Sequence, residues 1–191
     1  MTPRARLDAE GVVSAAARLA DAEGLEAATL TRLATELDVR APSLYAHVDG
    51  IPDLRARLAA RGARELAAAL QEAAAGRAGS EALTAVAQAY RDYALAHPGS
   101  YMAMQRAPRR DDAAARDASS APVDVLLAVL RAYGLTGDSG IHAARAVRSA
   151  LHGFVTLECN EGFGYPLALA ESYHRLVTIL DRGLAAAGET V

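Results

Sequence analysis

Apolar positions recur at three- and four-residue spacing along most of the chain, which is the period of a helix and not of a strand. The first such stretch lies between Asp8 and Gly24 and carries Val12, Val13, Ala16, Leu19 and Ala20. Asp8 is a favourable N-cap, and Gly24 is a favourable residue at a helix C-terminus. The pattern therefore predicts a helix between these two residues.

Two shorter helices are predicted directly afterwards. Thr29 is a good N-cap for a helix carrying Leu30, Leu33, Ala34 and Leu37, and Asp38 with Val39 interrupts that pattern. A second helix starts at residues 41–43 with Pro42 in its first turn, carries Leu44, Tyr45 and Val48, and ends at 49–50. Two short helices joined by a tight turn, behind a longer helix, outline a helix-turn-helix.

The remaining chain has the same helical period. Further helices are predicted over about 52–75, from Ser80 to just before His97, over 100–106, over 123–133, over 141–161 and over 166–187. The polar, Ala-rich stretch 109–121 is either a loop or the frayed start of the helix that follows it. The predicted fold class is all-α.

The composition agrees with a globular helical protein and limits the kinds of nucleic-acid binding that the chain can perform. Hydrophobic residues make up 52% of the 191 residues and charged residues 23%, with a formal net charge of −3. All 20 basic residues are arginine. This balance argues against a dedicated non-specific nucleic-acid binder, whereas a protein that inserts one short helix into a groove needs only local positive charge.

The single cysteine, Cys159, rules out an intramolecular disulfide and the usual structural zinc sites, so neither a metal nor a cofactor is expected. His152 and Cys159 are seven residues apart, two helical turns and too far for a nucleophile and its base. Without a phosphate-binding loop or nucleophile elbow, an enzyme is not expected. Since no apolar run of about 18 residues is free of charge, we expect a soluble cytoplasmic protein without a membrane partner.

The run Thr29–Val48 resembles the DNA-binding signature of the TetR family of bacterial transcription regulators. Its two halves, Leu-Ala-x-x-Leu-x-Val from Leu33 and Pro-Ser-Leu-Tyr-x-His-Val from Pro42, match in order and spacing. The resemblance is strong over Leu7–Leu58 and lies mainly in helical layout beyond it. It implies an N-terminal three-helix helix-turn-helix DNA-binding domain over 1–58 and a larger helical ligand-binding and dimerisation domain over 59–191.

The resemblance also implies roles for individual residues. The expected DNA-contacting residues are Thr31, Arg32, Arg40, Ala41, Pro42, Ser43, Tyr45 and His47. The residues 40–43 would enter the major groove, whereas Tyr45 and His47 resemble the phosphate-contacting pair that fixes register. One departure concerns the start of the next helix, where Gly50-Ile51-Pro52 replaces the usual lysine. Compensating arginines would be Arg55 and Arg57, or Arg4 and Arg6; the alternative is that nothing compensates and DNA affinity is weaker. Packing or purely surface roles for Tyr45, His47 and Arg32 are the alternatives.

The resemblance places an effector pocket in the middle of the chain and a dimer interface on the last two helices. The candidate pocket residues are Tyr90, Tyr93, Tyr101, Met102, Gln105, His152 and Phe154, and the candidate interface residues are Val147, Leu151, Val155, Leu169, Tyr173, Leu176 and Leu180. Leu151-His152-Gly153 resembles the Trp-His-Gly signature of one C-terminal class, and Gly153 suggests close approach of another backbone. The alternative is that both sets are ordinary core and that His152 is a structural histidine.

The sequence thus predicts a sequence-specific DNA-binding transcriptional regulator, a repressor released by a small-molecule effector. Its partners would be a palindromic double-stranded DNA operator, the effector and a second copy of the chain. The alternative is a helical small-molecule-binding or adaptor protein that has lost DNA binding, which the many acids of the first 58 residues favour.

Overall fold

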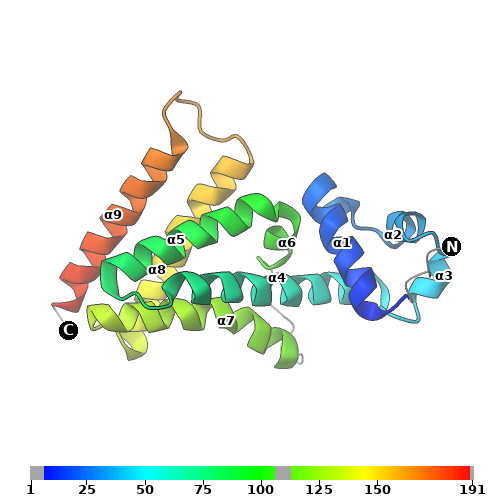
Figure 1. Ribbon diagram of the computed structural model, residues 1–191, viewed down its shortest axis with the longest axis horizontal. Coiled ribbons are helices and arrows are strands. Elements are labelled where there is room, and N and C mark those ends of the chain that lie inside the picture. Colours follow the sequence, from blue (N-terminus) through cyan, green and yellow to red (C-terminus); the bar gives the residue numbers. More distant parts are fainter. Residues whose placement is uncertain (1–6, 106–112, 190–191) are drawn as a thin grey trace. The chain divides into compact units, whose positions relative to one another are not determined.

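The computed structural model describes residues 7–105 and 113–189, and over these residues the chain is helical without a strand (Figure 1). The predicted all-α class is confirmed. The elements are α1 (Ala9–Glu23), η1 (Leu25–Ala27), α2 (Leu30–Glu36), α3 (Ala41–Leu44), α4 (Gly50–Ala74), α5 (Gly79–Ala96), α6 (Pro98–Ala103), α7 (Ala113–Leu130), η2 (Arg131–Tyr133), α8 (Gly137–Cys159) and α9 (Leu169–Gly188).

The chain divides into two compact units. Met1–Ala63 with His97–Ser119 forms one, here called the head unit, and Arg64–Ala96 with Ser120–Val191 forms the other, here called the body unit. The border between them falls inside α4, so that one continuous helix contributes residues to both. This division describes compactness; the functional division after residue 58 stays a prediction.

Local capping chemistry sets the bounds of α1 in the head unit. The Asp8 side chain accepts a hydrogen bond from the backbone N–H of Gly11 at 2.7 Å, which satisfies one of the orphan donors of the first turn. At the other end Gly24 has φ +89°, and its N–H donates to the Ala20 carbonyl at 2.9 Å. The predicted start and stop of this helix are confirmed.

The turn between α2 and α3 is a Schellman motif. Thr29 caps α2 by accepting from the Arg32 N–H at 3.3 Å. At the end of α2, Val39 N–H donates to the Ala34 carbonyl at 2.9 Å, and Asp38 adopts the left-handed region with φ +52°. This αL residue reverses the chain within three residues and brings α3 against α2.

The helix α3 is shorter than expected, because regular helix ends at Leu44 and not at Val48. The N–H groups of His47 and Val48 both donate to the Leu44 carbonyl, at 2.9 and 3.0 Å, so residues 45–47 continue as turns. Buried apolar side chains of the first four helices nevertheless meet in one cluster: Val12, Val13, Ala15, Ala16, Leu19, Leu30, Leu33, Ala34, Leu44, Val48 and Leu54. Each fully buried Leu or Val contributes about 1.5–3 kcal/mol.

The short helix α6 belongs to the head unit and lies against α1. A Cβ added at Gly99 would stand 2.1 Å from the Ala20 carbonyl carbon and oxygen, so only glycine permits this approach. The sequence predicts a short helix here but gives no sign that it packs on α1, because the contact joins residues about 80 positions apart.

In the body unit, α5 packs on α8 and α9, and these two pack on each other. The helix α7 begins at Ala113, ten residues before the expected start at Val123, and keeps Pro122 inside. The Ala-rich stretch before this proline has high helix propensity, which explains the earlier start. No single described helix is long and apolar enough to cross a membrane; one bent pair, Ala115–Tyr133 with Gly137–Cys159, meets that test together by length and composition.

Candidate nucleic-acid interface

The segment formed by α3 and the turns after it holds two apolar side chains inward, and a tyrosine between them points outward. Leu44 is 0% and Val48 2% exposed, and both belong to the buried cluster of the head. Tyr45, between them, is 63% exposed, so it is not a half-buried packing residue. Two buried anchors thus fix the rotation of this segment and leave the ring of Tyr45 free for a partner.

The start of this helix is also accessible. Arg40 occupies the N-cap position in an extended conformation (φ −80°, ψ 139°), and Pro42 and Ser43 in the first turn are exposed. Ala41 is half-buried and packs against the head cluster, and His47 beyond the helix is also half-buried. The expected groove-reading residues therefore lie together on one short segment, with a guanidinium at its leading edge.

The two expected contacts from α2 lie in its first turn, where both Thr31 and Arg32 are exposed. The Thr31 carbonyl accepts a hydrogen bond from the Thr35 hydroxyl at 3.1 Å. The Arg32 guanidinium is bound to Glu23 at the end of α1, with Nη2 2.6 Å from Oε1. In the free protein, then, this cation already has a carboxylate partner.

The arginines expected to compensate for the missing lysine are paired in the same way. Arg55 lies 2.5 Å from Glu26, and Arg57 lies 2.9 Å from Asp53 one turn earlier on α4. Arg4 and Arg6 lie outside the described residues. Across residues 7–63, Arg40 is the one arginine without a carboxylate within ion-pair distance. Free positive charge on this part of the head is therefore concentrated at the start of α3.

The candidate effector residues divide between the two units. Tyr101, Met102 and Gln105 lie in or just after α6 in the head unit, with Tyr101 fully buried and Met102 46% exposed. The remaining four, Tyr90, Tyr93, His152 and Phe154, lie in the body unit. That the two groups line one pocket stays a prediction.

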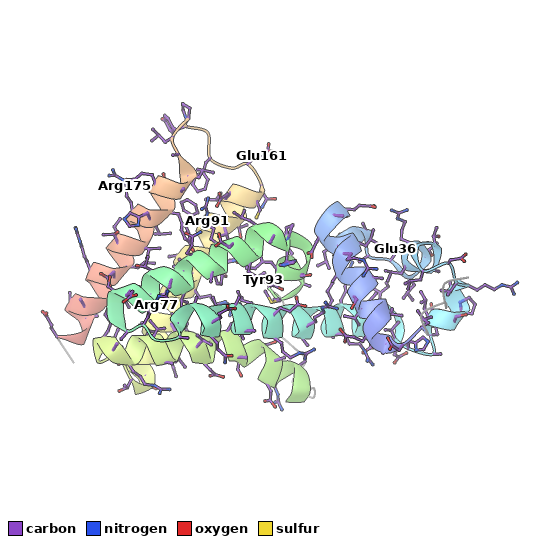
Figure 2. The ribbon with its side chains drawn as sticks, viewed as in Figure 1. Glu36, Arg77, Arg91, Tyr93, Glu161 and Arg175 are labelled. Atoms are coloured by element: carbon purple, nitrogen blue, oxygen red, sulfur yellow. The ribbon has the colours of Figure 1, made fainter. Side chains whose placement is uncertain are left out.

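In the body unit, Phe154 belongs to an aromatic cluster that lies beside a buried ion pair. Its ring lies 4.8 Å from that of Phe163 and 5.0 Å from that of Tyr173, between centroids. Arg91 of α5, which is labelled in Figure 2, lies over the Tyr173 ring with its guanidinium carbon 5.4 Å from the ring centroid. It binds Glu158 of α8 through two hydrogen bonds of 2.8 and 2.5 Å. Bonding to Glu158 raises the pKa of Arg91 further above its usual value.

Sequence reasoning did not single out Arg91 and Glu158 as partners. They are 67 positions apart, and only the packing of α5 on α8 joins them. The two tyrosines of α5, Tyr90 and Tyr93, are buried, and the Tyr93 hydroxyl donates a hydrogen bond to Glu65 at 3.2 Å. The half-buried His152 lies 3.4 Å from the Thr156 hydroxyl, and burial together with Arg148 lowers the pKa of its imidazole.

A cavity of about 430 Å³ opens in the body unit at residues that the sequence did not mark. It is lined by Gln71, Ala74, Ala75, Arg77, Ala78, Ala82, Asp124, Val125, Ala128, Val129 and Ala132. Small side chains on α4, α5 and α7 leave this space open. Since alanine is abundant throughout the chain, no local signal distinguishes these positions. Within the described ranges, no group of three or more His, Cys, Asp or Glu could hold a metal ion.

The candidate interface residues are mostly core of their own chain. Val147, Leu151, Val155 and Tyr173 are at most 3% exposed, so their side chains have no area left for a partner, and the prediction that they form an interface is corrected for these four. Periodicity finds an apolar stripe but does not say what covers it. Leu169, Leu176 and Leu180 are half-buried.

The outward faces of α8 and α9 carry other residues. Ile141 is 43%, Leu157 48% and Ile179 68% exposed. Gly153 lies one turn before Leu157 on α8, Gly183 lies one turn after Ile179 on α9, and a Cβ added at either glycine would meet nothing within 4 Å. The expected close approach at Gly153 is therefore not to another part of this chain among the described residues.

A three-helix head with an anchored, outward-facing second short helix, attached to a helical body, defines a helix-turn-helix regulator. Residues 83–180 match the family model described as "Tetracyclin repressor-like, C-terminal domain". The chain is 42% identical over 158 residues to the uncharacterized HTH-type transcriptional regulator Rv0681 of Mycobacterium tuberculosis, covering 81% of this chain and 71% of that protein.

A second relative and solved structures support the same family assignment. The uncharacterized HTH-type transcriptional regulator YobS of Bacillus subtilis is 36% identical over 164 residues, covering 85% of each chain. The structure of Mycobacterium smegmatis BioQ superposes with a TM-score of 0.70, and a structure of BioQ with its double-stranded DNA operator superposes with a TM-score of 0.69, both at 26% identity over 95% of this chain and 99% of the other. The chain therefore belongs to the TetR family of transcriptional regulators, as its DNA-binding signature predicts.

Proposed function

We propose that this regulator binds a palindromic operator as a homodimer and acts as a repressor that a small-molecule effector releases. The observation that carries the proposal is the exposed segment Arg40–Tyr45, held in place by Leu44 and Val48 in the head core. A free guanidinium at its start suits bidentate pairing with guanine, and the Pro42 and Ser43 side chains suit contact with a thymine methyl. Thr31, Ala41 and His47 complete the proposed contact surface.

Two copies are needed because one short helix reads only a few base pairs. A two-fold dimer places two such helices one DNA turn apart, about 34 Å, on a palindrome. Its interface is proposed on the outward faces of α8 and α9, where Ile179 and Leu157 are exposed and two glycines allow helices to approach closely. The half-buried Leu169, Leu176 and Leu180 would contribute at its edges.

The effector site is proposed among the aromatic residues of the body unit, with Tyr90, Tyr93, His152 and Phe154 as its lining. Aromatic walls with a few polar groups are typical of small-molecule sites. The effector must bind the DNA-free state more tightly than the DNA-bound state, since equal affinity would shift nothing. In this proposal residues 1–58 read DNA and residues 59–191 bind the effector and the second copy.

Selection of bound fragments from genomic DNA tests this function. We expect enrichment of fragments with an inverted repeat, protection of both half-sites, and release on addition of one compound from an effector library. Binding to monomeric half-sites with equal affinity would overturn the dimeric mode. Retention of no fragment would favour the second candidate, a ligand-binding protein without DNA affinity, which the carboxylate pairing of Arg32, Arg55 and Arg57 supports.

A further inference from the structure

The ion pair between Glu23 and Arg32 lies at the edge of the proposed DNA-contacting surface. Its nitrogen–oxygen distance is 2.6 Å, and the Arg32 and Glu23 side chains are 55% and 48% exposed. Because both ends remain in contact with water, the pair exchanges partners readily. Exposed pairs of this kind are worth about 0–1 kcal/mol. A phosphate oxygen can therefore replace the carboxylate of Glu23 at the guanidinium.

The position of Glu23 at the C-terminus of α1 is electrostatically unfavourable for a carboxylate. It is the last residue of α1, and the last turn of this helix contains no basic residue. The carbonyl groups at a helix C-terminus carry partial negative charge, which disfavours a carboxylate there. Arg32, in the first turn of α2, supplies the compensating charge from the next helix.

Arg32 stands where a helix-turn-helix meets the DNA backbone. The first helix of the motif crosses the sugar-phosphate backbone while the second enters the groove. Thr29 caps α2 through the Arg32 N–H, which fixes the backbone of Arg32 in the first helical turn. The side chain is then the mobile part, and it has two competing anionic partners: the Glu23 carboxylate and a phosphate.

We infer that Glu23 lowers the DNA affinity of this regulator by competing with a DNA phosphate for the guanidinium of Arg32. Glu23 does not touch DNA; it acts through Arg32. The inference rests on the proposed DNA-binding function and deepens it. Because a phosphate contact carries no sequence information, Glu23 lowers affinity for all sequences alike, and stable binding then depends on the base contacts of α3 and on the second copy.

Glu23→Gln tests the inference, since it removes the charge and keeps the size of the side chain. The probes are a duplex recovered from the genomic selection and a mixed-sequence duplex of equal length, titrated across about 50–200 mM salt. We expect Glu23→Gln to bind both duplexes about three- to fivefold more tightly, the upper range for loss of one exposed ion pair. The slope of log K against log salt should steepen by up to about one.

A matched control and a double-mutant cycle isolate the cause. Glu81→Gln removes the same charge from an exposed pair with Arg77 in the body unit and should leave both affinities unchanged. Arg32→Ala should weaken binding to both duplexes, and Glu23→Gln should have no effect in the Arg32→Ala background. Thermal unfolding followed by circular dichroism confirms that each variant folds.

Three results would overturn the inference and leave the proposed function intact. Equal tightening in the Arg32→Ala background would show that Glu23 repels DNA directly. Weaker binding by Glu23→Gln would show that the pair holds Arg32 in position for DNA, and unchanged binding would show that the two anions do not compete. Failure of the wild-type protein to bind either duplex at low salt would overturn the proposed function and this inference together, and is distinguished from the other results by that wild-type measurement.

Discussion

The carboxylate of Asp21, near the end of α1, accepts a hydrogen bond from the backbone N–H of Ser100 at 2.7 Å. The same carboxylate lies 3.3 Å from the Ser100 hydroxyl and 3.2 Å from Nδ1 of His97. Ser100 is buried, and its N–H is one of the N-terminal donors of α6 that no helical carbonyl can satisfy. One side chain of the helix-turn-helix thus fixes a helix from the middle of the chain.

Asp21→Ala is expected to destabilise the head unit. The substitution leaves the buried Ser100 N–H without an acceptor, which costs about 1–3 kcal/mol of unfolding free energy. Urea denaturation followed by circular dichroism measures it. Glu36→Ala, which removes only an exposed ion pair with Arg18, should cost about 0–1 kcal/mol. Equal losses of unfolding free energy in the two variants would show that the Asp21–Ser100 contact stabilises the protein no more than an exposed ion pair does.

Glu158→Ala is expected to be among the most damaging substitutions in the body unit. It leaves Arg91 charged and mostly buried without its carboxylate, a loss of about 3–5 kcal/mol. Replacing both residues, as Arg91→Met with Glu158→Leu, should recover most of this stability, because no uncompensated charge remains. The free energy of unfolding of the single and double variants decides this; a double variant no more stable than Glu158→Ala contradicts the argument.

Alkaline pH is expected to destabilise the protein through two tyrosines. Burial raises the pKa of Tyr133, aided by its hydrogen bond to Asp181 at 2.5 Å, and burial likewise raises the pKa of Tyr173. Both pKa values exceed the unfolded value of about 10, so the stabilising contribution is complete below pH 10 and is lost as the pH rises above it.

Unfolding free energy measured from pH 8 to 11 checks this expectation. The double variant Tyr133→Phe and Tyr173→Phe should have a flatter profile, although it is less stable at neutral pH, because the hydroxyl of Tyr173 donates to the Ala87 carbonyl. Tyr165→Phe, at an 87% exposed position, should leave the profile unchanged. A profile that stays steep in the double variant would assign the loss to other groups.

Tyr45→Ala and Arg40→Ala are expected to affect DNA binding differently. Tyr45 is proposed to contact phosphate through an uncharged hydroxyl, so its loss should weaken binding to all sequences and leave the salt slope unchanged. Arg40 is proposed to contact a base, so its loss should relax preference at one or two positions of the operator at a cost of about 1–3 kcal/mol. Repeating the fragment selection with each variant distinguishes the two; unchanged binding in both contradicts the proposed contacts.

Ile179→Glu is expected to break the proposed dimer. The side chain is 68% exposed on α9, and a carboxylate buried between two copies without a partner would cost several kcal/mol. Sedimentation equilibrium should show a shift from dimer to monomer. Leu95→Glu, at a 41% exposed position on α5, serves as the control and should remain dimeric. A dimeric Ile179→Glu protein would place the interface elsewhere.

Features determined by neighbouring residues were predicted from the sequence. Asp8 and Thr29 cap the helices that they were expected to cap, and Gly24 ends the first of them, because each interaction spans four residues or fewer. The inward positions of Leu44 and Val48 follow in the same way from helical spacing. The helix-turn-helix can thus be predicted from a single sequence, because the interactions that define it are local.

Features that depend on distant residues were not predicted. Val147 and Tyr173 would show the same three- and four-residue apolar spacing whether they packed against a second copy or inside their own chain. The structure shows that both are buried within their own chain. The Asp21–Ser100 bond and the Arg91–Glu158 pair join residues 79 and 67 positions apart. Only the packing of helices brings such groups together, so neither could be read from local pattern.

The head unit is assembled from two separate stretches of chain, since α6 lies against α1 and the border with the body unit falls within α4. The DNA-binding head of this chain is therefore not a single continuous N-terminal segment. In a chimera that joins the first 58 residues to the body of another regulator, Ala20 and Asp21 would face an α6 of different sequence. Successful recombination would have to carry residues 97–103 along with the head, so that the two segments are inherited together.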